Sequence, residues 1–322
     1  MKPIAPSSVS IEAIRSARDS LAGCFVRTPL IRFEAAEMPG EVWLKLESLQ
    51  PIGSFKLRGA GNAIARADPR DLERGVYTAS AGNMAQGVAW NARRLGIPCT
   101  VVVPETAPRT KLTAIERLGG RIVALPFERW WQVLVEHEYP GMEGVFIHPV
   151  SDPDVIAGNG TIGLEILEDL PDVDAIAVPY GGGGLSSGIA AAVRALRPGT
   201  RVFACEVETA APLSAALRAG SPQEISYTPS FVDGIGGRGL LAEMWPLVSK
   251  SLDGALVMSL SEIAGAVRIL ATRNRVIAEG AGATPVAAAL SGKAGSGKVV
   301  CVVSGGNIDA AKLCKILEGD VP

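Results

Sequence analysis

The feature that most constrains this chain is an alternation of short apolar runs with longer amphipathic segments. Each run is followed by a segment with helical spacing of its apolar residues; the runs are GVYTAS (75–80), PCTVVVP (98–104), RIVALP (121–126), DAIAVP (174–179), RVFACEV (201–207) and KVVCVVS (298–304). Strands buried on both faces of a parallel sheet have this composition, and the segments between them supply the crossover helices. The pattern predicts an α/β fold.

The alternation falls into two groups, which predicts two lobes. We expect a small substrate-side domain over residues 71–149 and a large cofactor-binding domain built from residues 1–70 and 150–322. The stretch IHPVSDPDVIAGNG (147–160) is rich in Pro, Asp and Gly, which is typical of a connection between lobes. A ligand is then expected in the cleft, at the C-terminal ends of the strands.

Composition excludes several classes of partner. The formal net charge is -2 and aromatic residues make up 5% of the chain, so neither nucleic acid nor an anionic membrane is an expected partner. The apolar runs are also far too short to span a bilayer. Five scattered cysteines form no CxxC pair, which favours a reducing cytoplasm. Two histidines, His137 and His148, leave little material for a Ser-His-Asp triad or a histidine-rich metal centre.

Four consecutive glycines form the strongest local motif, VPYGGGGLSSG (178–188). After a strand and before a helix, such a loop lets backbone N–H groups converge on a phosphate, and the helix adds its positive end. The alternative is a tight turn, but a turn needs only one or two glycines. The motif is neither G-x-G-x-x-G nor a Walker A loop. GKAGSGKV (292–299) has the Walker spacing, but Val299 replaces the Ser/Thr and a strand follows.

Two further loops join a strand to a helix. In TASAGNMAQG (78–87), the residues Ser80, Ala81, Gly82 and Asn83 could bind a carboxylate through helix N-terminal amides, or Ser80 could cap the helix. In VVSGGNIDAAK (302–312), Ser304 ends a buried strand.

The lysine in GSFKLRGA (53–60) indicates which ligand these loops would bind together. Lys56 stands among Ile52, Phe55 and Leu57, and an apolar pocket lowers the pKa of an amine toward its reactive neutral form. The alternative is a solvated surface lysine. A lysine amine together with a phosphate cradle indicates pyridoxal 5'-phosphate.

The order of the motifs strengthens this interpretation. GSFKLRGA, SAGN…AQGVA, AGNGTIGLEIL, GGGGL, EGAGA and VVSGGN follow one another as in the serine/threonine dehydratase family, and the sequence resembles that family from about Thr28 to Asp309. The resemblance implies the two-lobed fold-type-II architecture of pyridoxal-phosphate enzymes, related to tryptophan synthase β, and a homodimer. A divalent or monovalent cation is left open.

The resemblance also implies roles for individual residues. Lys56 would be the Schiff-base lysine and Phe55 would pack on the cofactor ring. Asn83 would bond the ring hydroxyl, Ser304 would face the pyridine nitrogen, and Ser80 with its loop amides would hold the substrate carboxylate. The phosphate would rest on the amides of Gly181, Gly182, Gly183, Gly184 and Leu185.

The implied activity is β-elimination from a 3-hydroxy amino acid, such as threonine, serine or a bulkier aryl analogue, to a 2-oxo acid and ammonia. A β-replacement synthase of the same fold is an alternative. A racemase is disfavoured, because Ala81 occupies the place of the second serine of racemases resembling SSGNH. A non-enzymatic protein that binds a phosphate ligand is the distant alternative.

Three positions bear on specificity. Met84 stands where the family usually has histidine; either it only packs in the core, or it admits a bulky or aromatic β-substituent, as in phenylserine dehydratases. Glu208 resembles the first ligand of the family's cation site, but Ser214 stands where an aspartate is often found, so Glu208 is equally a strand-end charge. Trp130, beside Trp131, is expected in the core or at an interface.

Overall fold

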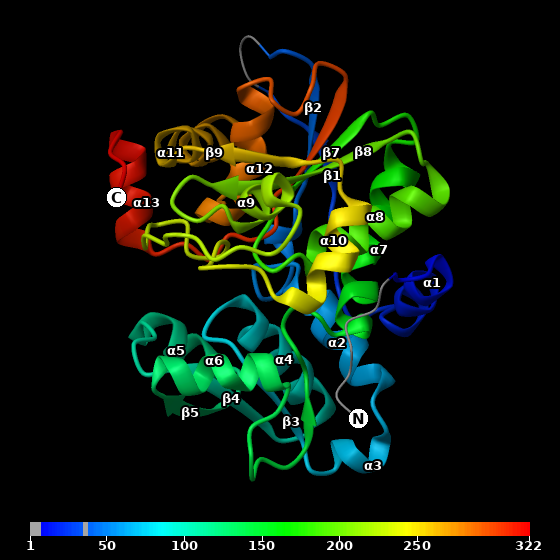
Figure 1. The fold of residues 1–322 in the computed structure, drawn as a ribbon, viewed down its shortest axis with the longest axis vertical. Coiled ribbons are helices and arrows are strands. Elements are labelled where there is room, and N and C mark those ends of the chain that lie inside the picture. The colour runs from blue at the N-terminus through cyan, green and yellow to red at the C-terminus, as the bar shows by residue number, and fades with distance from the viewer. Residues whose placement is uncertain (1–7, 35–37) are drawn as a thin grey trace.

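The computed structural model describes residues 8–34 and 38–322, and its framework is two sheets (Figure 1). The larger sheet has six strands in the order β1-β2-β10-β7-β8-β9. Their bounds are β1 Leu30–Arg32, β2 Glu41–Lys45, β7 Ala175–Pro179, β8 Arg201–Val207, β9 Ala255–Met258 and β10 Lys298–Val302. All neighbouring pairs are parallel except the edge pair β1 and β2, which is antiparallel.

The smaller sheet has four parallel strands in the order β5-β4-β3-β6 and lies in the lower part of Figure 1. Its strands are β3 Val76–Ala79, β4 Cys99–Pro104, β5 Arg121–Leu125 and β6 Val145–Phe146. The predicted α/β class with parallel sheets is therefore confirmed. The assignment of residues 71–149 to one domain and of the remainder to the other stays a prediction, with the smaller sheet inside the shorter segment.

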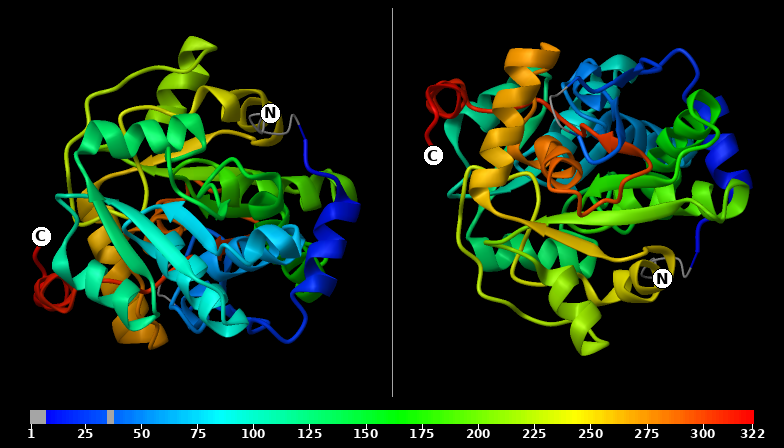
Figure 2. Two further views of the ribbon diagram at one scale, coloured as in Figure 1. Left: turned by 90° about the horizontal axis from the view of Figure 1, so that it is seen from below. Right: turned by 90° about the horizontal axis from the view of Figure 1, so that it is seen from above.

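Helices cover both faces of the larger sheet, as Figure 2 shows from above. Along β10, Val299 and Cys301 join the apolar core beneath α11 and α12, whereas Val300 and Val302 join the core that contains α8. The helices are α1 Ile11–Ser20, α2 Lys56–Arg66, α3 Pro69–Leu72, α4 Asn83–Leu95, α5 Arg109–Arg117, α6 Phe127–Glu136, α7 Pro153–Asp169, α8 Gly184–Leu196, α9 Pro212–Ala219, α10 Trp245–Ser251, α11 Leu260–Ile269, α12 Gly280–Leu290 and α13 Ala310–Glu318. None of them, within the described part of the chain, is long and apolar enough to cross a membrane.

Helix α7 corrects the prediction that residues 147–160 form a connection. The connection ends at Asp152, whose carboxylate accepts the N–H groups of Asp154 and Val155 and so caps a helix that continues through the glycines. Those glycines permit close packing rather than turns. A Cβ on Gly158 would lie 2.7 Å from the Arg58 carbonyl oxygen in α2, and one on Gly160 would lie 2.9 Å from the carbonyl oxygen of Gly188 in α8.

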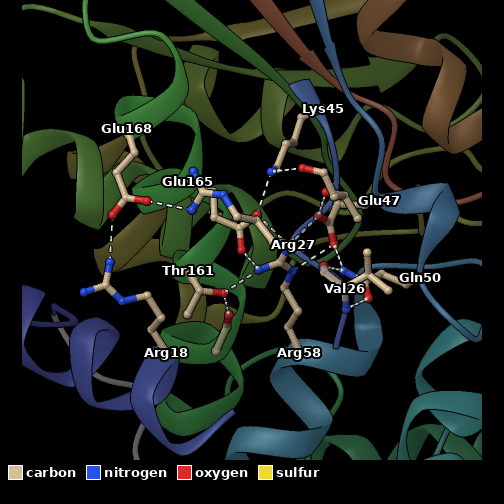
Figure 3. A network of polar contacts seen from close by, with 12 residues as sticks. Arg18, Val26, Arg27, Lys45, Glu47, Gln50, Arg58, Thr161, Glu165 and Glu168 are labelled. Carbon is tan, nitrogen blue, oxygen red and sulfur yellow. Dashed lines mark hydrogen bonds and ion pairs between the residues drawn. The ribbon is translucent and has the colours of Figure 1, made fainter. Parts of the chain in front are cut away.

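A buried ion network fixes the other side of α2 (Figure 3). Both Arg58 and Lys45 are inaccessible to solvent and share the carboxylate of Glu165, with N–O distances of 2.5 Å. Arg58 also donates through Nε and Nη2 to Glu47, at 2.9 and 2.7 Å. Because both cations and both anions are paired, this network holds α2 against β2 and α7 without an uncompensated buried charge.

Candidate active site

A cavity of about 460 Å³ lies between the two sheets, at the C-terminal ends of β3, β7 and β10. It brings together residues from distant parts of the sequence, among them Phe55, Lys56, Ser80–Met84, Trp130, Gly181–Leu185, Asp233–Gly236, Glu279, Ser304 and Asn307. Its size and position are those of a ligand site in an α/β protein. Every predicted site residue except Glu208 lines this cavity.

Lys56 occupies the first position of α2 and projects its amine into the cavity. The preceding residue is anchored, since the N–H of Phe55 donates to the carbonyl oxygen of Ser304 at 3.0 Å. Lys56 Nζ donates to the carbonyl oxygen of Pro149 at 2.7 Å and lies 5.3 Å from the Phe55 ring centroid. Removal from bulk water lowers the pKa of Lys56 to about 8, because burial penalises the charged form. The amine therefore reaches its neutral, nucleophilic form at a lower pH than an exposed lysine does.

The glycine loop after β7 leads into α8 with an open backbone. Gly183 adopts φ +96°, and a Cβ on Gly184 would lie 2.6 Å from the Val150 carbonyl oxygen, so both positions require glycine. At Gly181, a Cβ would meet no atom nearer than 3.6 Å. The first N–H that bonds back into the helix belongs to Ser187, which donates to the carbonyl oxygen of Gly183 at 2.9 Å. The three preceding N–H groups, of Gly184, Leu185 and Ser186, have no acceptor within the helix and suit an anion.

The loop after β3 excludes one of the two alternatives that the sequence left open, the capping of α4 by Ser80. Ser80 does not cap α4, because the residue before the helix is Gly82, which provides no side-chain cap. Instead, Ser80 Oγ accepts the N–H of Gly82 at 3.2 Å. The first-turn amides of α4 therefore remain without a side-chain cap beside Ser80 and Ala81, in the cavity wall. This arrangement is compatible with carboxylate binding.

Sequence reasoning missed a buried acid in this cavity, Glu279, which immediately precedes α12. Its Oε1 accepts a hydrogen bond from Asn83 Nδ2 at 2.9 Å. Burial, followed by the charge of Asp233, raises the pKa of Glu279 to about 7. The motif EGAGA contained the residue, but only the fold brings it to Asn83, which is 196 positions away in the sequence.

Met84 and Trp130 form part of the apolar wall. Met84 belongs to the apolar core beside the smaller sheet and also lines the cavity, so core packing and a role in specificity are compatible. Trp130 lies in α6, partly buried against the same sheet and lining the cavity, whereas Trp131 is 40% exposed. No local sequence pattern indicated that Trp130 reaches the cavity.

The candidate cation ligand lies outside the cavity. Glu208 is exposed and accepts the backbone N–H of Leu260 at 2.8 Å, at the start of α11. The neighbouring Glu206 is buried and accepts the N–H groups of Leu213 and Ser214, each at 2.8 Å. Both carboxylates thus stabilise helix N-termini, which is the structural alternative the sequence raised. Cation binding at Glu208 stays a prediction.

A second group of polar side chains links the end of α6 with the segment before α10. His137 Nε2 lies 2.9 Å from Glu243 Oε1, and its ring stacks on that of His148 at 4.3 Å. His148 Nδ1 accepts the N–H groups of Val150 and Ser151, and burial lowers the pKa of His148 to about 3. Because His148 Nδ1 accepts from the backbone and its Nε2 lies 3.2 Å from the carbonyl oxygen of Leu134, this group is better explained as a structural contact than as a metal site.

These residues fit pyridoxal phosphate on geometric grounds. A desolvated amine, an open glycine turn with free helix N–H groups and the polar side chains of Asn83 and Ser304 line one cavity. The donor set matches the aldehyde, the phosphate and the ring heteroatoms of that cofactor.

Comparison with known proteins agrees with this geometry. The family model described as pyridoxal-phosphate dependent enzyme matches residues 22–305. The L-threonine ammonia-lyase of Thermotoga maritima is 41% identical over 315 residues, covering 96% of this chain and 78% of that protein. The catabolic L-threonine dehydratase TdcB of Escherichia coli is 38% identical, covering 96% of each protein.

Solved structures give the same result. Maize serine racemase superposes with a TM-score of 0.86 at 33% identity, covering 97% of both chains. A threonine deaminase from T.th. superposes with a TM-score of 0.85, also at 33% identity, covering 93% of this chain and 99% of that one. The chain therefore belongs to the pyridoxal-phosphate-dependent enzymes. Within that class it has the fold-type-II architecture, as the resemblance implied.

Proposed function

We propose that the chain is a pyridoxal-phosphate-dependent ammonia-lyase that converts a 3-hydroxy amino acid into a 2-oxo acid and ammonia. The observation that carries the proposal is that the Lys56 amine and the glycine turn before α8 line the same cavity. The relatives named as threonine ammonia-lyases and dehydratases support this reaction class.

Each wall of the cavity has a part in holding the reactants. The N–H groups at the start of α8 would bind the phosphate, and Asn83 and Ser304 would hold the polar atoms of the ring. The amides of the Ser80–Asn83 loop would bind the substrate carboxylate. When bound, pyridoxal phosphate supplies an electron sink that makes the Cα proton of an amino acid removable.

Proton movement follows from the state of Lys56. With its pKa lowered to about 8, the amine exists partly neutral near physiological pH and accepts the Cα proton at Nζ. The Pro149 carbonyl, which accepts a hydrogen bond from Nζ in this structure, holds the amine within the cavity.

The proposal is tested by assaying a panel of 3-hydroxy amino acids for release of a 2-oxo acid. Borohydride reduction of the holoenzyme followed by peptide mass mapping is expected to find the cofactor attached at Lys56. Attachment at another lysine, or none, contradicts the assignment. Parallel assays with an added thiol and with a single enantiomer separate this reaction from β-replacement and from racemisation.

We further propose that the substrate carries a bulky or aromatic group at its β-carbon. Met84 and Trp130, together with Ala107, Pro108 and Ile235, give the cavity an apolar wall to receive such a group. Faster turnover of phenylserine than of threonine supports this finer proposal. The reverse order refutes it and leaves the reaction class intact.

The remaining expectations concern assembly and location. A homodimer and a cytoplasmic location, both expected from the sequence, stay predictions. Sedimentation of the purified protein at several concentrations tests the first.

A further inference from the structure

A carboxylate in the cavity has no part in the reaction as proposed above. Glu279 is buried, with 7% of its surface exposed, and its Oε1 accepts a hydrogen bond from Asn83 Nδ2. The space around it is narrow: a Cβ on Gly305 would lie 2.7 Å from Oε1, and one on Gly234 would lie 3.2 Å away. The carboxylate therefore has little freedom to move away from Asn83.

The orientation of Asn83 is fixed by a second amide. Asn307 Nδ2 donates to the backbone carbonyl of Ile52 at 2.9 Å and to Asn83 Oδ1 at 2.8 Å. Because a carbonyl only accepts, the amide nitrogen of Asn307 must face Ile52, and the neighbouring Asn83 atom must be its oxygen. The nitrogen of Asn83 then faces Glu279. One of its two hydrogens is used there, and the other is free for a ligand in the cavity.

These contacts cross between the lobes. Asn83 begins α4 in the small lobe, whereas Glu279 and Asn307 precede α12 and α13 in the large lobe. The amide that the resemblance assigns to the cofactor ring is thus held from the side opposite to its own helix. An ionised Glu279 satisfies this arrangement, since it only accepts hydrogen bonds.

A protonated Glu279 does not satisfy it equally well. A neutral carboxyl keeps a carbonyl oxygen that can accept from Asn83 Nδ2, but this oxygen is a weaker acceptor than a carboxylate, and the Asn83 nitrogen cannot accept the O–H of the carboxyl. If the Asn83 amide turned over to accept, its nitrogen would face the Asn307 nitrogen, and the bond between the two amides would be lost. The charge of Glu279 therefore strengthens the hydrogen bond that holds the Asn83 amide in this orientation.

Charged side chains on several elements affect the pKa of the Glu279 carboxyl. Asp233 repels it, although Lys111 and Lys312 lie 3.2 and 3.5 Å from Asp233 and offset part of this effect. Lys56 lines the same cavity. Burial and Asp233 raise the pKa of Glu279 to about 7, so the group changes charge near neutral pH.

We propose that Glu279 is a positioning residue, whose ionised carboxylate aligns the Asn83 amide so that its second Nδ2–H faces the ring oxygen of the cofactor. The inference rests on the proposed function, because that function places the cofactor beside Asn83. It adds a pH-dependent control of the bound cofactor by a residue that need not touch the substrate.

The test is an absorbance titration of the bound cofactor in the holoenzyme, from about pH 5 to about pH 9. We expect a spectral transition with a midpoint near 7 in the wild type and its loss in Glu279→Gln, which keeps the size of the side chain but not its charge. Asp233→Asn removes the repelling charge, so its midpoint is expected to fall by roughly half a pH unit or more. Glu224→Gln, an exposed acid with no place in the cavity, is the matched control and is expected to titrate like the wild type.

A Glu279→Gln enzyme that titrates like the wild type overturns the inference. If that variant does not fold, an unshifted midpoint in Asp233→Asn overturns it instead. Failure of the wild type itself to bind the cofactor at Lys56 is a different result, since it contradicts the proposed function rather than the role of Glu279.

Discussion

Arg58 and Lys56 lie two residues apart at the start of α2, and they differ in whether a carboxylate compensates the charge. Arg58 is enclosed by Glu47 and Glu165 (Figure 3). Burial alone would lower the pKa of Arg58, but the two carboxylates raise it above its usual value. Two residues earlier, Lys56 has a backbone carbonyl as its hydrogen-bond partner and, among the residues that the structure describes, no carboxylate paired with it, and burial lowers its pKa.

The difference teaches how one helix serves both stability and reactivity. Where every buried charge has an opposite partner, protonation states are fixed and the set is structural. Where buried charges lack full compensation, as at Lys56 and Glu279, their pKa values move toward neutrality and the groups can exchange protons. Four predictions test this contrast, from the largest expected effect to the smallest.

Replacing the uncompensated lysine has the largest effect. Lys56→Ala is expected to reduce 2-oxo acid release by at least about 10³-fold, because it removes both the covalent attachment point and the base. Lys111→Ala, which removes a cavity-edge lysine, is the comparison and is expected to retain the covalent cofactor. Equal losses in the two variants would falsify the special role of Lys56.

Removing the paired arginine is expected to affect folding instead. Arg58→Met leaves Glu47 and Glu165 buried without Arg58, which is expected to lower the free energy of unfolding by about 3–5 kcal/mol. Urea unfolding of the apo protein measures this loss. Arg70→Met, which breaks an exposed pair with Asp68, is expected to change little. A loss at Arg58 no larger than that at Arg70 contradicts the structural role of the network.

Neutralising the buried acid is expected to stabilise the apo protein at high pH. The pKa of Glu279 is raised to about 7 in the fold, above its usual value of 4.5, so the folded state binds the proton more tightly. Stability is therefore lost as pH rises from 4.5 to 7, and above that range Glu279→Gln is expected to be more stable by on the order of 3 kcal/mol. Urea unfolding near pH 8 and near pH 4 measures the gap, which is expected to close at the lower pH. A gap independent of pH argues against a buried charge.

The smallest effect concerns the apolar wall. Met84→His is expected to shift the ratio of kcat/KM for phenylserine over threonine by about tenfold toward threonine, since it replaces an apolar contact with a polar one. Met84→Leu, which conserves volume and polarity, is the control. An unchanged ratio in Met84→His assigns Met84 to core packing alone.

The sequence was sufficient for the features that depend on local pattern. The alternation of short apolar runs with helical segments predicted the parallel sheets, because strands buried on both faces must be apolar. The same local reasoning failed at Gly158 and Gly160, since glycine marks close helix packing as well as turns. It also left the N-terminus of α4 open between two readings, of which the cap by Ser80 is wrong because Gly82 precedes the helix.

The site could be predicted only in part, for a related reason. Lys56 and the glycine turn carry their chemistry in short motifs. Glu279 and Trp130 do not, because each acquires its place from residues far away in the sequence, as the contact between Asn83 and Glu279 illustrates. A long-range contact of this kind leaves no local signal in a single chain.

The short segment from β6 to α7 contacts both the Lys56 amine and the glycine turn before α8. Its Pro149 carbonyl is the hydrogen-bond acceptor of the Lys56 amine, and its next residue, Val150, packs against the glycine turn. The segment is continuous with β6 on one side and with the capped start of α7 on the other, so both elements position the oxygen that the ammonium ion faces. The backbone between two elements of regular structure thus contributes to the free energy of the proton on Lys56 and so to the strength of this base.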